Sequence, residues 1–584
     1  MANVLMLGAG LGGLSTAMLL ARDGHQVTVL ERDLAEPPPA ARAWEAWERR
    51  GVNQFHLPHF MLPRWRVQME REVPEVLDEL GAAGGLRINC IGMFPASRRG
   101  PLGDGDERFE TVTARRPALE AAVAAVAGRT PGVRIRRGVA VTGLLTDPNE
   151  RTPVPRVRGV LTRGGQTVRA DLVVDCGGRR SQLGSWLEAA GGRRPVEERE
   201  DSGFVYYARH FRSRTGELPA VRSNLIQHYD SVTLLTLPAD NGTWSVVVTS
   251  SSRDRALRGL RDQRRWEAAV ARYPLVANWL DGEPITGIDV IAGIEDRHRR
   301  LVVDAHPVAT GIVAVGDAWA CTNPSLGRGA AIGLLHAGCL RDVLRDVDPG
   351  DPEKLARRFD EMTTTTVEPL YRMTLGFDRH RLAEIDADIA GTPYATDDRR
   401  WHVGKALFAA SLVDHDACRA YQSLASFLAT PDELFAQPGL LDRVLTLGAG
   451  APGTRCPDRH ARSCSPPSPT EPRTLAPRAG RQPCGSSSTT SPSASRTPAP
   501  AARCCSTAGP TAAASGATRS RPWPRPATAC SPPTSGRSGT PASPPRPRPT
   551  PRRAWSATWS ACSTACRSNR PTWSATTGAR RSPG

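Results

Sequence analysis

The chain of 584 residues lacks several features that would assign it to a membrane or to an oxidising compartment. It has no uninterrupted run of about 18 apolar residues, the length that a membrane-spanning helix needs, and no basic segment of a signal peptide at its amino end. Five cysteines in the first 451 residues show neither metal-ligand nor disulfide spacing: Cys90, Cys176, Cys321, Cys339 and Cys418. We therefore expect a cytoplasmic protein with reduced thiols, no membrane span and no metal site.

Residues 452–584 lack almost all aliphatic side chains. They contain no Val, Ile, Met, Phe, Tyr or Lys, and a single leucine, Leu475. Such a segment cannot bury enough apolar surface to offset the entropy lost on folding, so we expect disorder. It also carries 20 Arg and two acids, which gives this segment a charge of +18. The whole chain has a formal charge of +17, so the first 451 residues sum to about −1. The nearly neutral folded part gives no reason to expect nucleic-acid binding.

The composition of this tail suggests a cause. Nearly all of its residues have codons with G or C in the second position, as a reading-frame shift in a GC-rich gene would produce. We interpret residues 452–584 as a frameshifted translation. The alternative is a basic arm for RNA, DNA or an anionic membrane.

A nucleotide-binding pattern opens the chain, in MLGAGLGGLSTAMLLARDGHQVTVLERD from Met6 to Asp33. Apolar runs predict strands over 3–7 and 26–30, and helical spacing predicts a helix over 14–22. The glycines between them suit a tight turn, close approach to a pyrophosphate, and close packing of helix on strand. Glu31 stands where an acid takes the ribose hydroxyls. The candidate cofactor-binding residues here are Gly8, Gly10, Gly13, Glu31 and the adjacent Arg32; the pattern does not separate NAD from FAD, and a turn without ligand is the alternative.

The pattern along the rest of the chain predicts an α/β protein. We expect a helix over 64–80 and an Ala-rich helix from Arg116, then short strands near 133–137, 139–145, 156–162 and 172–174. Residues 203–250 are strongly β in character and predict an inserted antiparallel sheet. Helical spacing returns at 255–273 and 330–345, with strands at 287–294 and 312–315 between them. We expect a Rossmann-like domain over 1–350 with a β-rich substrate domain at about 196–300, a helical region over 351–451, and a disordered tail over 452–584.

The stretch GIVAVGDAWACTNPSLGRGAAIGLLHAG points to a flavin. An acid at a strand end, Asp317 after Gly316, can bond the ribityl hydroxyls, and glycines at a helix start let backbone N–H groups reach the isoalloxazine edge. NAD has no ribityl chain. The candidate residues in this stretch are Gly316, Asp317, Pro324, Gly327 and Gly329.

Three motifs together resemble the FAD-dependent monooxygenases of the aromatic-hydroxylase superfamily, which have the fold of para-hydroxybenzoate hydroxylase. They are GAGLGGLSTA with Glu31, DLVVDCGGRRSQLGSWL, and VGDAWACTNPSLGRG. The resemblance implies a role in FAD and pyridine-nucleotide binding for the middle motif, with Asp175, Gly178, Arg179 and Ser181, and a position near the FAD for Arg116. Many members have a histidine where Trp319 stands, which leaves the substrate-side chemistry open.

The resemblance implies an enzyme that uses FAD and NADH or NADPH to insert one oxygen atom from O2 into an electron-rich small molecule, through a flavin C4a-hydroperoxide. A flavin-dependent alkene reductase of the geranylgeranyl-reductase type is the main alternative. A halogenase fits less well, because the W-x-W-x-I-P motif is missing and the lysines of the chain, Lys354 and Lys405, lie beyond the cofactor domain. A non-enzymatic flavin-binding protein is the third alternative.

The sequence does not identify the catalytic residues, the substrate or the oligomeric state. His56 and His59, in FHLPH, are candidates for catalysis, but lone histidines are more often structural. Tyr206, Tyr207 and Phe211 on the predicted inserted sheet could form a substrate wall or simply the core of the sheet.

Overall fold

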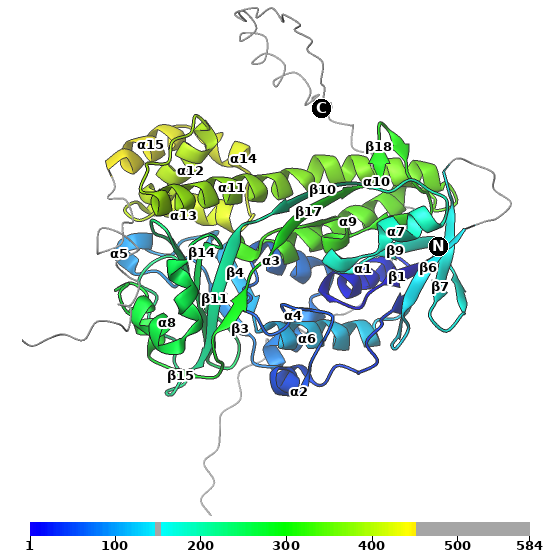
Figure 1. Ribbon diagram of the computed structural model, residues 1–584, viewed down its shortest axis with the longest axis horizontal. Helices are drawn as coiled ribbons and strands as arrows, with labels where there is room; N and C mark the ends of the chain where they lie inside the picture. Colours follow the sequence, from blue (N-terminus) through cyan, green and yellow to red (C-terminus); the bar gives the residue numbers. More distant parts are fainter. Residues whose placement is uncertain (147–153, 451–584) are drawn as a thin grey trace, which may run out of the picture. The chain divides into compact units, whose positions relative to one another are not determined.

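The structure is a computed structural model that describes residues 1–146 and 154–450. The tail over 452–584, for which the sequence predicts disorder, lies outside the described residues. Figure 1 shows the arrangement of the helices and strands of the described part. A parallel sheet, an antiparallel sheet and a group of carboxy-terminal helices can be distinguished within it.

The parallel sheet carries the nucleotide-binding pattern. Its five strands lie in the order β20-β9-β1-β2-β5 and all neighbours are parallel. Their bounds are β1 Asn3–Leu7, β2 Gln26–Leu30, β5 Val133–Arg136, β9 Leu172–Asp175 and β20 Ile312–Ala314. β1 and β9 are almost wholly buried apolar runs, as expected for a sheet covered on both faces.

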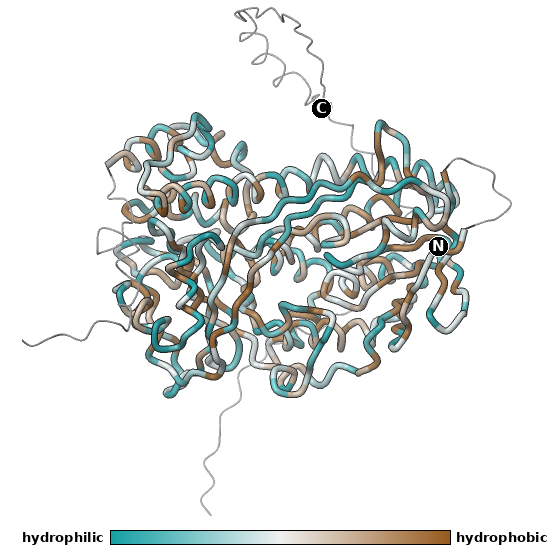
Figure 2. The backbone as a smooth tube through the Cα atoms, viewed as in Figure 1, coloured by the Kyte–Doolittle hydropathy of each residue, from teal (hydrophilic) through white to brown (hydrophobic). Residues whose placement is uncertain are grey.

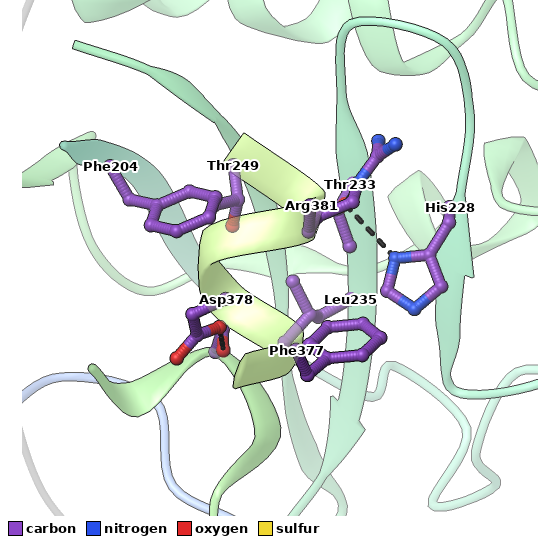
Figure 3. A pocket seen from close by; sticks show the side chains of 9 residues that line it. Phe204, His228, Thr233, Leu235, Thr249, Phe377, Asp378 and Arg381 are labelled. Carbon is purple, nitrogen blue, oxygen red and sulfur yellow. Dashed lines mark hydrogen bonds between the residues drawn. The ribbon is translucent and has the colours of Figure 1, made fainter. Parts of the chain in front are cut away.

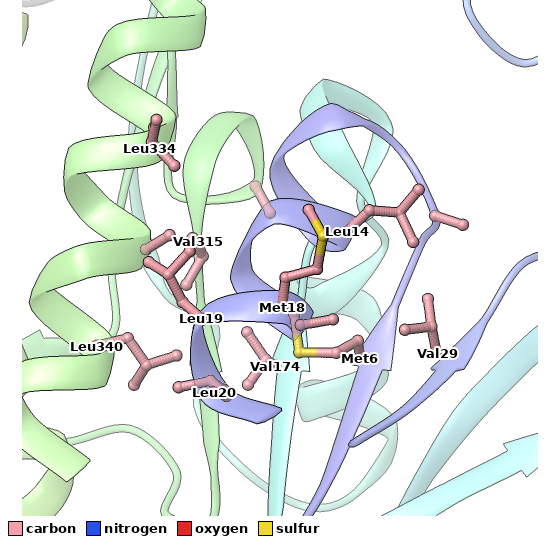
Figure 4. Close-up of a cluster of buried hydrophobic side chains, with 14 of the residues drawn as sticks. Met6, Leu14, Met18, Leu19, Leu20, Val29, Val174, Val315, Leu334 and Leu340 are labelled. Carbon is pink, nitrogen blue, oxygen red and sulfur yellow. The ribbon is translucent and has the colours of Figure 1, made fainter. Parts of the chain in front are cut away.

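Helices α1 (Leu11–Arg22) and α9 (Gly329–Asp346) follow β1 and β20 and pack against each other. Residues Gly13 to Ala21 of α1 are all buried, because the helix lies between the sheet and α9. Figure 4 shows the apolar core at this place, with Leu19 and Leu20 of α1 directed toward Leu340 of α9. This packing fixes the start of α1 relative to the start of α9.

Further elements surround the parallel sheet. The helix α6 (Arg116–Arg129) packs on α1, and the small sheet β6-β7-β8 lies against β9. The remaining elements of this part are η1 Ala40–Arg42, α2 Ala43–Ala46, β3 Leu86–Asn89, α5 Ala96–Arg99, η2 Asp106–Phe109, β4 Glu110–Thr113, β6 Val141–Thr146, β7 Val157–Thr162, β8 Thr167–Arg169, η3 Gly178–Arg180, α7 Leu183–Ala189, β18 Val302–Val303 and β19 His306–Pro307. The predicted helix over 64–80 is two helices, α3 (Pro63–Glu72) and α4 (Glu75–Ala82), because Pro74 interrupts the helical hydrogen bonds.

The antiparallel sheet contains the residues that the sequence predicts as strongly β. Its order is β12-β13-β14-β11-β15, and β16 also pairs with β11. The bounds are β11 Phe204–Arg212, β12 Ile226–His228, β13 Thr233–Pro238, β14 Thr243–Ser251, β15 Glu283–Pro284 and β16 Asp289–Ile291. Between β14 and β15 the chain forms η4 Ala256–Arg261, α8 Gln263–Val270 and η5 Ala277–Leu280.

Alternation along β11 divides its aromatic side chains between the two faces of this sheet. Tyr207 and Phe211 belong to an apolar cluster with Trp244 and Trp266, on the side of α8. Tyr206 belongs to the opposite cluster, which includes Ile385 of helix α11 (Glu368–Ala390). Only Tyr206 of these three therefore faces the side where α11 packs.

Two charged strands were not anticipated from the sequence. β10 (Val196–Asp201) and β17 (Glu295–Arg300) pair with each other, and β17 also pairs with β21 (Ala320–Cys321). Figure 2 shows both long strands as hydrophilic. Arg372 and Arg379 of α11 bind Glu198 and Glu200 of β10, and Arg299 of β17 binds Glu197 of β10. Ion pairs therefore take the place of apolar packing along β10.

The carboxy-terminal part is helical. Its helices are α10 Pro352–Thr366, α11, α12 Arg399–Ala410, α13 His415–Ala425, α14 Pro431–Phe435 and α15 Leu440–Gly450. Among the helices that the structure describes, none combines the length and the apolar character needed to cross a membrane.

Candidate functional site

The turn after β1 has the geometry of a dinucleotide-binding loop. Gly8 has a φ of +106°, which favours glycine. A Cβ at Gly13 would lie 2.1 Å from the Gly8 carbonyl oxygen, so only glycine lets α1 approach the turn this closely. A Cβ at Gly10, in contrast, would meet no atom within 4 Å. The three glycines therefore have the three geometries that the sequence predicts, with open space beside Gly10.

This open space lies at an uncapped helix end. Gly10 is the N-cap of α1, no side chain caps the helix there, and its first helical hydrogen bond runs from Leu14 N–H to the Gly10 oxygen. The backbone N–H groups of the first turn have no partners within the helix, and they form its partially positive end. A phosphate is the natural ligand of such a site.

Glu31 is buried at the end of β2 and already accepts three hydrogen bonds. Its Oε2 accepts from Ala9 N–H at 2.9 Å and from Arg49 Nη2 at 2.7 Å, and its Oε1 accepts from Asp33 N–H at 3.0 Å. A carboxylate can accept about four hydrogen bonds. One position on Oε1 is therefore left for a ribose hydroxyl.

Arg49 is a site residue that the sequence patterns did not reveal. It is 6% exposed and also donates to Glu120 Oε2 at 2.6 Å. Burial disfavours the charged guanidinium, but Glu120 and Glu31 hold the pKa of Arg49 above its ordinary value. No motif marks this arginine, which lies in the polar segment WERRGV after the second strand.

The predicted flavin segment around Gly316 and Asp317 lies at the same edge of the parallel sheet as the Gly8 turn. Leu7 of β1 pairs with Asp175 of β9, and Asp175 pairs with Ala314 of β20. The carboxyl ends of β1 and β20 therefore lie two strand spacings apart, about 10 Å. Gly316 and Asp317 follow β20 in the turn η6 (Gly316–Ala318), on the same side as the Gly8 turn.

Arg116 connects the two segments. It begins α6, donates from Nε to Glu120 Oε1 at 2.6 Å, and completes a chain of ion pairs from Glu31 through Arg49 and Glu120. Burial raises the pKa of Asp317, and the positive charges of Arg116 and Arg179 oppose that rise. Arg116 thus lies close enough to Asp317 to act on its carboxylate.

The loop before α9 is open on the side of its predicted ligand. Pro324, Gly327 and Gly329 are exposed, and a Cβ at Gly329 would meet no atom within 4 Å. Gly327 has a φ of +65°, and no side chain caps α9 at Arg328. The start of α9 is therefore a second uncapped helix end, with open space beside Gly329.

Two other predicted residues have different surroundings. The carboxylate of Asp175 accepts from Gly177 N–H at 2.8 Å and from the Ser181 hydroxyl, so it shapes its own loop. Arg32 is exposed, and its guanidinium lies against the backbone of Gly51. Direct cofactor contact by Asp175 and Arg32 stays a prediction.

His336 of α9 supports the second segment. Its Nδ1 accepts from Gly316 N–H at 3.3 Å, and its Nε2 lies 3.1 Å from the Thr363 hydroxyl. Burial lowers the pKa of His336 to about 3, so the ring is neutral and carries its proton on Nε2. Nothing in the sequence distinguishes this histidine from a core residue.

The residues that were candidates for catalysis have structural partners. His59 accepts from Arg116 on Nε2 and donates from Nδ1 to the Leu57 oxygen at 2.8 Å. Burial lowers the pKa of His59 to about 4. His56 stacks edge-on against Trp44 and lies 3.2 Å from the Trp47 oxygen. Trp319 is buried against His336.

The donor set fits an FAD molecule. The open space beside Gly10 and Gly329 would be filled by any other side chain, and each space lies at the positive end of a helix. Two carboxylates that can accept from hydroxyl groups lie along the same sheet edge: Glu31 follows β2, on the far side of β1 from β20, and Asp317 follows β20. The arrangement can hold phosphates, two groups of sugar-type hydroxyls and a polar ring edge in one row.

Comparisons with known proteins agree with this interpretation. Residues 6–36 match the NAD(P)-binding Rossmann-like domain, and residues 108–351 match the FAD binding domain. The chain is 30% identical to Protein Rv3254 of Mycobacterium tuberculosis (strain ATCC 25618 / H37Rv) over 399 residues, which cover 64% of this chain and 79% of that protein.

Two solved structures are among those similar to the chain. One is pqsL, a probable FAD-dependent monooxygenase from Pseudomonas aeruginosa, at 18% identity and a TM-score of 0.48, covering 66% of this chain and 99% of pqsL. The other is CmlS, a flavin-dependent halogenase, at 16% identity and a TM-score of 0.49, covering 73% of this chain and 76% of CmlS.

Proposed function

Because the chain belongs to the FAD-dependent monooxygenases of the aromatic-hydroxylase type, we propose that it uses NADH or NADPH to insert one oxygen atom of O2 into a small, electron-rich organic molecule. The observation that carries this proposal is the meeting of the Gly8 turn and Asp317 at one sheet edge, with two uncapped helix ends beside them. An enzyme of this type needs one cofactor held across both segments.

We propose the following contacts for the ADP half of FAD. The N–H groups at the start of α1, around Gly10, bind the pyrophosphate. Glu31 accepts from the ribose through its remaining position on Oε1. Arg49 holds Glu31 and Glu120 in place, since it bonds both carboxylates.

The flavin half lies along the second segment in this proposal. Asp317 accepts from the ribityl hydroxyls, and the positive charge of Arg116 opposes the rise in the pKa of Asp317 that burial causes. Gly327 and Gly329 let backbone N–H groups approach the ring edge, and the positive end of α9 favours a reduced, anionic ring. His336 positions the Gly316 turn through its hydrogen bond to the Gly316 N–H.

When bound, FAD supplies the electron transfer and the activation of oxygen, and the protein supplies position and a dry surrounding. Tyr206 faces this side of β11, as Phe204 does, and its hydroxyl donates to Asn323 Oδ1 at 2.5 Å, next to Pro324. The antiparallel sheet thereby contacts the loop before α9, which contains Pro324 and Gly327 and which we assign to the flavin. A substrate held between them would be shielded from water on the sheet side.

The test is to purify the full chain and to follow NADH or NADPH oxidation together with oxygen uptake in the presence of candidate phenols. The proposal expects a yellow protein whose substrate-stimulated oxygen uptake accompanies hydroxylated product. A flavin-dependent alkene reductase would reduce its substrate without consuming oxygen, and a binding protein would consume neither nucleotide nor oxygen. Either result would replace the monooxygenase assignment.

A further inference from the structure

Asp378 is a buried acid on the side of α11 that faces the antiparallel sheet (Figure 3). It is 3% exposed. Phe204, Leu235 and Phe377 line the same small cavity, which has room for about one water molecule. A negative charge at this position is therefore cut off from most of the water that would hydrate it.

The carboxyl group of Asp378 has few hydrogen bonds for a charged group. Its Oδ1 accepts from the Ser325 hydroxyl at 2.6 Å, and its buried Oδ2 has no hydrogen-bond partner among the described residues. A carboxylate can accept about four hydrogen bonds, so this environment stabilises the charged form poorly. Burial raises the pKa of Asp378 to about 7, with the charge of Asp296 adding to the rise, while Ser325, Arg328 and Asn323 oppose it. Asp378 therefore changes its charge near neutral pH.

The Ser325 hydroxyl joins Asp378 to the loop before α9. Ser325 lies in the turn η7 (Pro324–Leu326) of this flavin loop, which comprises residues 322–328. Gly327, which we assign to the edge of the flavin ring, follows two positions later. A change of charge at Asp378 therefore occurs one hydrogen bond away from the loop that the proposed function assigns to the ring.

Arg328 is a buried cation at the start of α9. Its Nη1 donates to Thr374 Oγ1 at 3.2 Å, its guanidinium lies 4.5 Å from the centre of the Phe427 ring, and its Nε has no hydrogen-bond partner among the described residues. Burial lowers the pKa of Arg328 to about 10, and the carboxylate of Asp378 is the main influence that opposes this fall. When Asp378 is neutral, the charge of Arg328 adds to the positive end of α9, whereas an ionised Asp378 offsets it.

We propose that Asp378 sets the charge beside the flavin loop: it takes up a proton from solution when the flavin is reduced and releases that proton when the flavin is oxidised again. This inference rests on the proposed function, because it needs the flavin ring at this loop. It does not depend on the fate of the oxygen molecule. Asp378 acts through Arg328 and the loop without touching the ring, which makes it a positioning residue.

The charges and protons of this step balance. Transfer of a hydride from NADH or NADPH to FAD brings two electrons and one proton and leaves one negative charge on the ring. That charge favours the neutral form of Asp378, so one proton from solution converts its carboxylate to the carboxylic acid, and no other bond changes. By linkage, the neutral form of Asp378 favours the reduced flavin to the same extent.

The expected size of this coupling follows from electrostatics. Two charges roughly 10 Å apart change each other's equilibrium by about 10-fold when the effective dielectric constant is about 20. Reduction of the flavin should therefore favour protonation of Asp378 by about 10-fold. Between pH 7 and pH 8 this amounts to about half a proton more for each flavin that is reduced.

The other titratable groups that face Asp378 keep their charge states above pH 7. They are Tyr206, His228, Asp296, Arg328 and Arg381. Burial holds the pKa of Tyr206 well above and the pKa of His228 well below their ordinary values, so both are neutral. Burial raises the pKa of Asp296 to about 6, so its carboxylate is ionised, and the two arginines stay charged.

Spectroelectrochemical titration of the FAD-loaded full chain between pH 6 and pH 8.5 tests the proposal. The slope of the midpoint potential against pH counts the protons that are taken up with the two electrons. At pH 8.5 reduction should be about 10-fold less favourable in the wild type than in Asp378→Asn, which is about 30 mV for a two-electron couple. At pH 6, where both side chains are neutral, the two potentials should agree.

Asp378→Asn separates charge from packing, because asparagine has nearly the same size and is neutral at every pH. Asp386→Asn removes a partly exposed acid of the same helix and is the matched control, with the slope of the wild type. Infrared difference spectra of the reduced and oxidised protein should show the carbonyl band of a protonated carboxyl group gained on reduction in the wild type and missing in Asp378→Asn. If Asp378→Asn does not fold, the presence or absence of this band in the wild type still decides.

Equal slopes in the wild type and Asp378→Asn would overturn the proposal, as would a potential difference of the same size at pH 6 and pH 8.5, which a merely structural role would produce. A chain that binds FAD and shows equal slopes refutes this inference alone. A chain that shows the expected slopes but consumes no oxygen with its substrate refutes the proposed monooxygenation alone. A chain that binds no FAD refutes both.

Discussion

Two alanine substitutions in the first glycine loop should separate folding from cofactor binding. In Gly13→Ala the new Cβ would lie 2.1 Å from the Gly8 oxygen, whereas real Cβ atoms essentially never come within 3.0 Å of such an atom. Helix α1 would have to move away by about 1 Å, since 3.0 minus 2.1 is 0.9 Å. Overpacking that displaces backbone in a core costs about 3 kcal/mol, so Gly13→Ala should be strongly destabilised.

Gly10→Ala should fold as well as the wild type, because its Cβ would meet no atom within 4 Å. The methyl group would instead occupy the space that we assign to the pyrophosphate. Losing one hydrogen bond to a charged group costs about 1.5–3 kcal/mol, which is a 10- to 100-fold loss of FAD affinity.

The assay combines thermal unfolding without FAD with an FAD titration followed by flavin fluorescence. Gly128→Ala is the control, because Gly128 is exposed on α6 and a Cβ there would meet no atom within 4 Å, so it should change neither quantity adversely. A Gly10→Ala variant that binds FAD as tightly as the wild type would refute the placement of the pyrophosphate. A Gly13→Ala variant of unchanged stability would refute the packing argument.

Two further substitutions test the buried charges. Arg49→Met should destabilise the protein by about 3–5 kcal/mol, because Glu31 and Glu120 lose a shared cation. Adding Glu120→Gln should restore part of the thermal stability. An unchanged melting temperature of the Arg49→Met variant would contradict the chain of ion pairs. Burial raises the pKa of Asp378 from 3.8 to about 7, so the folded state keeps a proton that the unfolded state releases, and stability should fall as the pH rises from about 4 to 7. Asp378→Asn should remove that fall, which is on the order of 1.4 kcal/mol of unfolding free energy per pH unit, measured by urea unfolding. Equal slopes of unfolding free energy against pH in the variant and the wild type would contradict this prediction.

The sequence predicts the nucleotide-binding unit well because local rules determine it. Strands β1 and β2 have the predicted bounds, and Gly8, Gly10 and Gly13 have the geometries that their positions in the motif imply. The Gly316–Asp317 turn reaches the same sheet edge because parallel strands all end on one side. These features depend on glycine conformations and on short apolar runs, which are visible in the sequence.

The rest depends on contacts between distant parts of the chain. Arg49 joins Glu31 and Glu120, which no local spacing reveals. The charged strand β10 lacks apolar alternation because its glutamates pair with arginines of α11 and with Arg299 of β17. Among these differences from the sequence prediction, the break of the predicted helix over 64–80 had a local signal, which is Pro74.

The buried Asp378 of α11 is the clearest case of such long-range dependence. Asp378 has an ordinary sequence context. Its raised pKa follows from burial next to the turn η7 (Pro324–Leu326), more than 50 positions earlier in the chain. The division of the three candidate substrate-wall residues between the two faces of the sheet also depends on long-range packing. Tyr206 faces this side, while Tyr207 and Phe211 belong to the core of the other face.

The most direct test of the whole account is a titration of the full chain with FAD, comparing the wild type with Gly10→Ala and with Asp317→Leu. The account predicts one FAD per wild-type chain and a loss of affinity in both variants, because the two distant segments hold opposite halves of the same molecule. A chain that fails to bind FAD, or an Asp317→Leu variant with wild-type affinity, would contradict it.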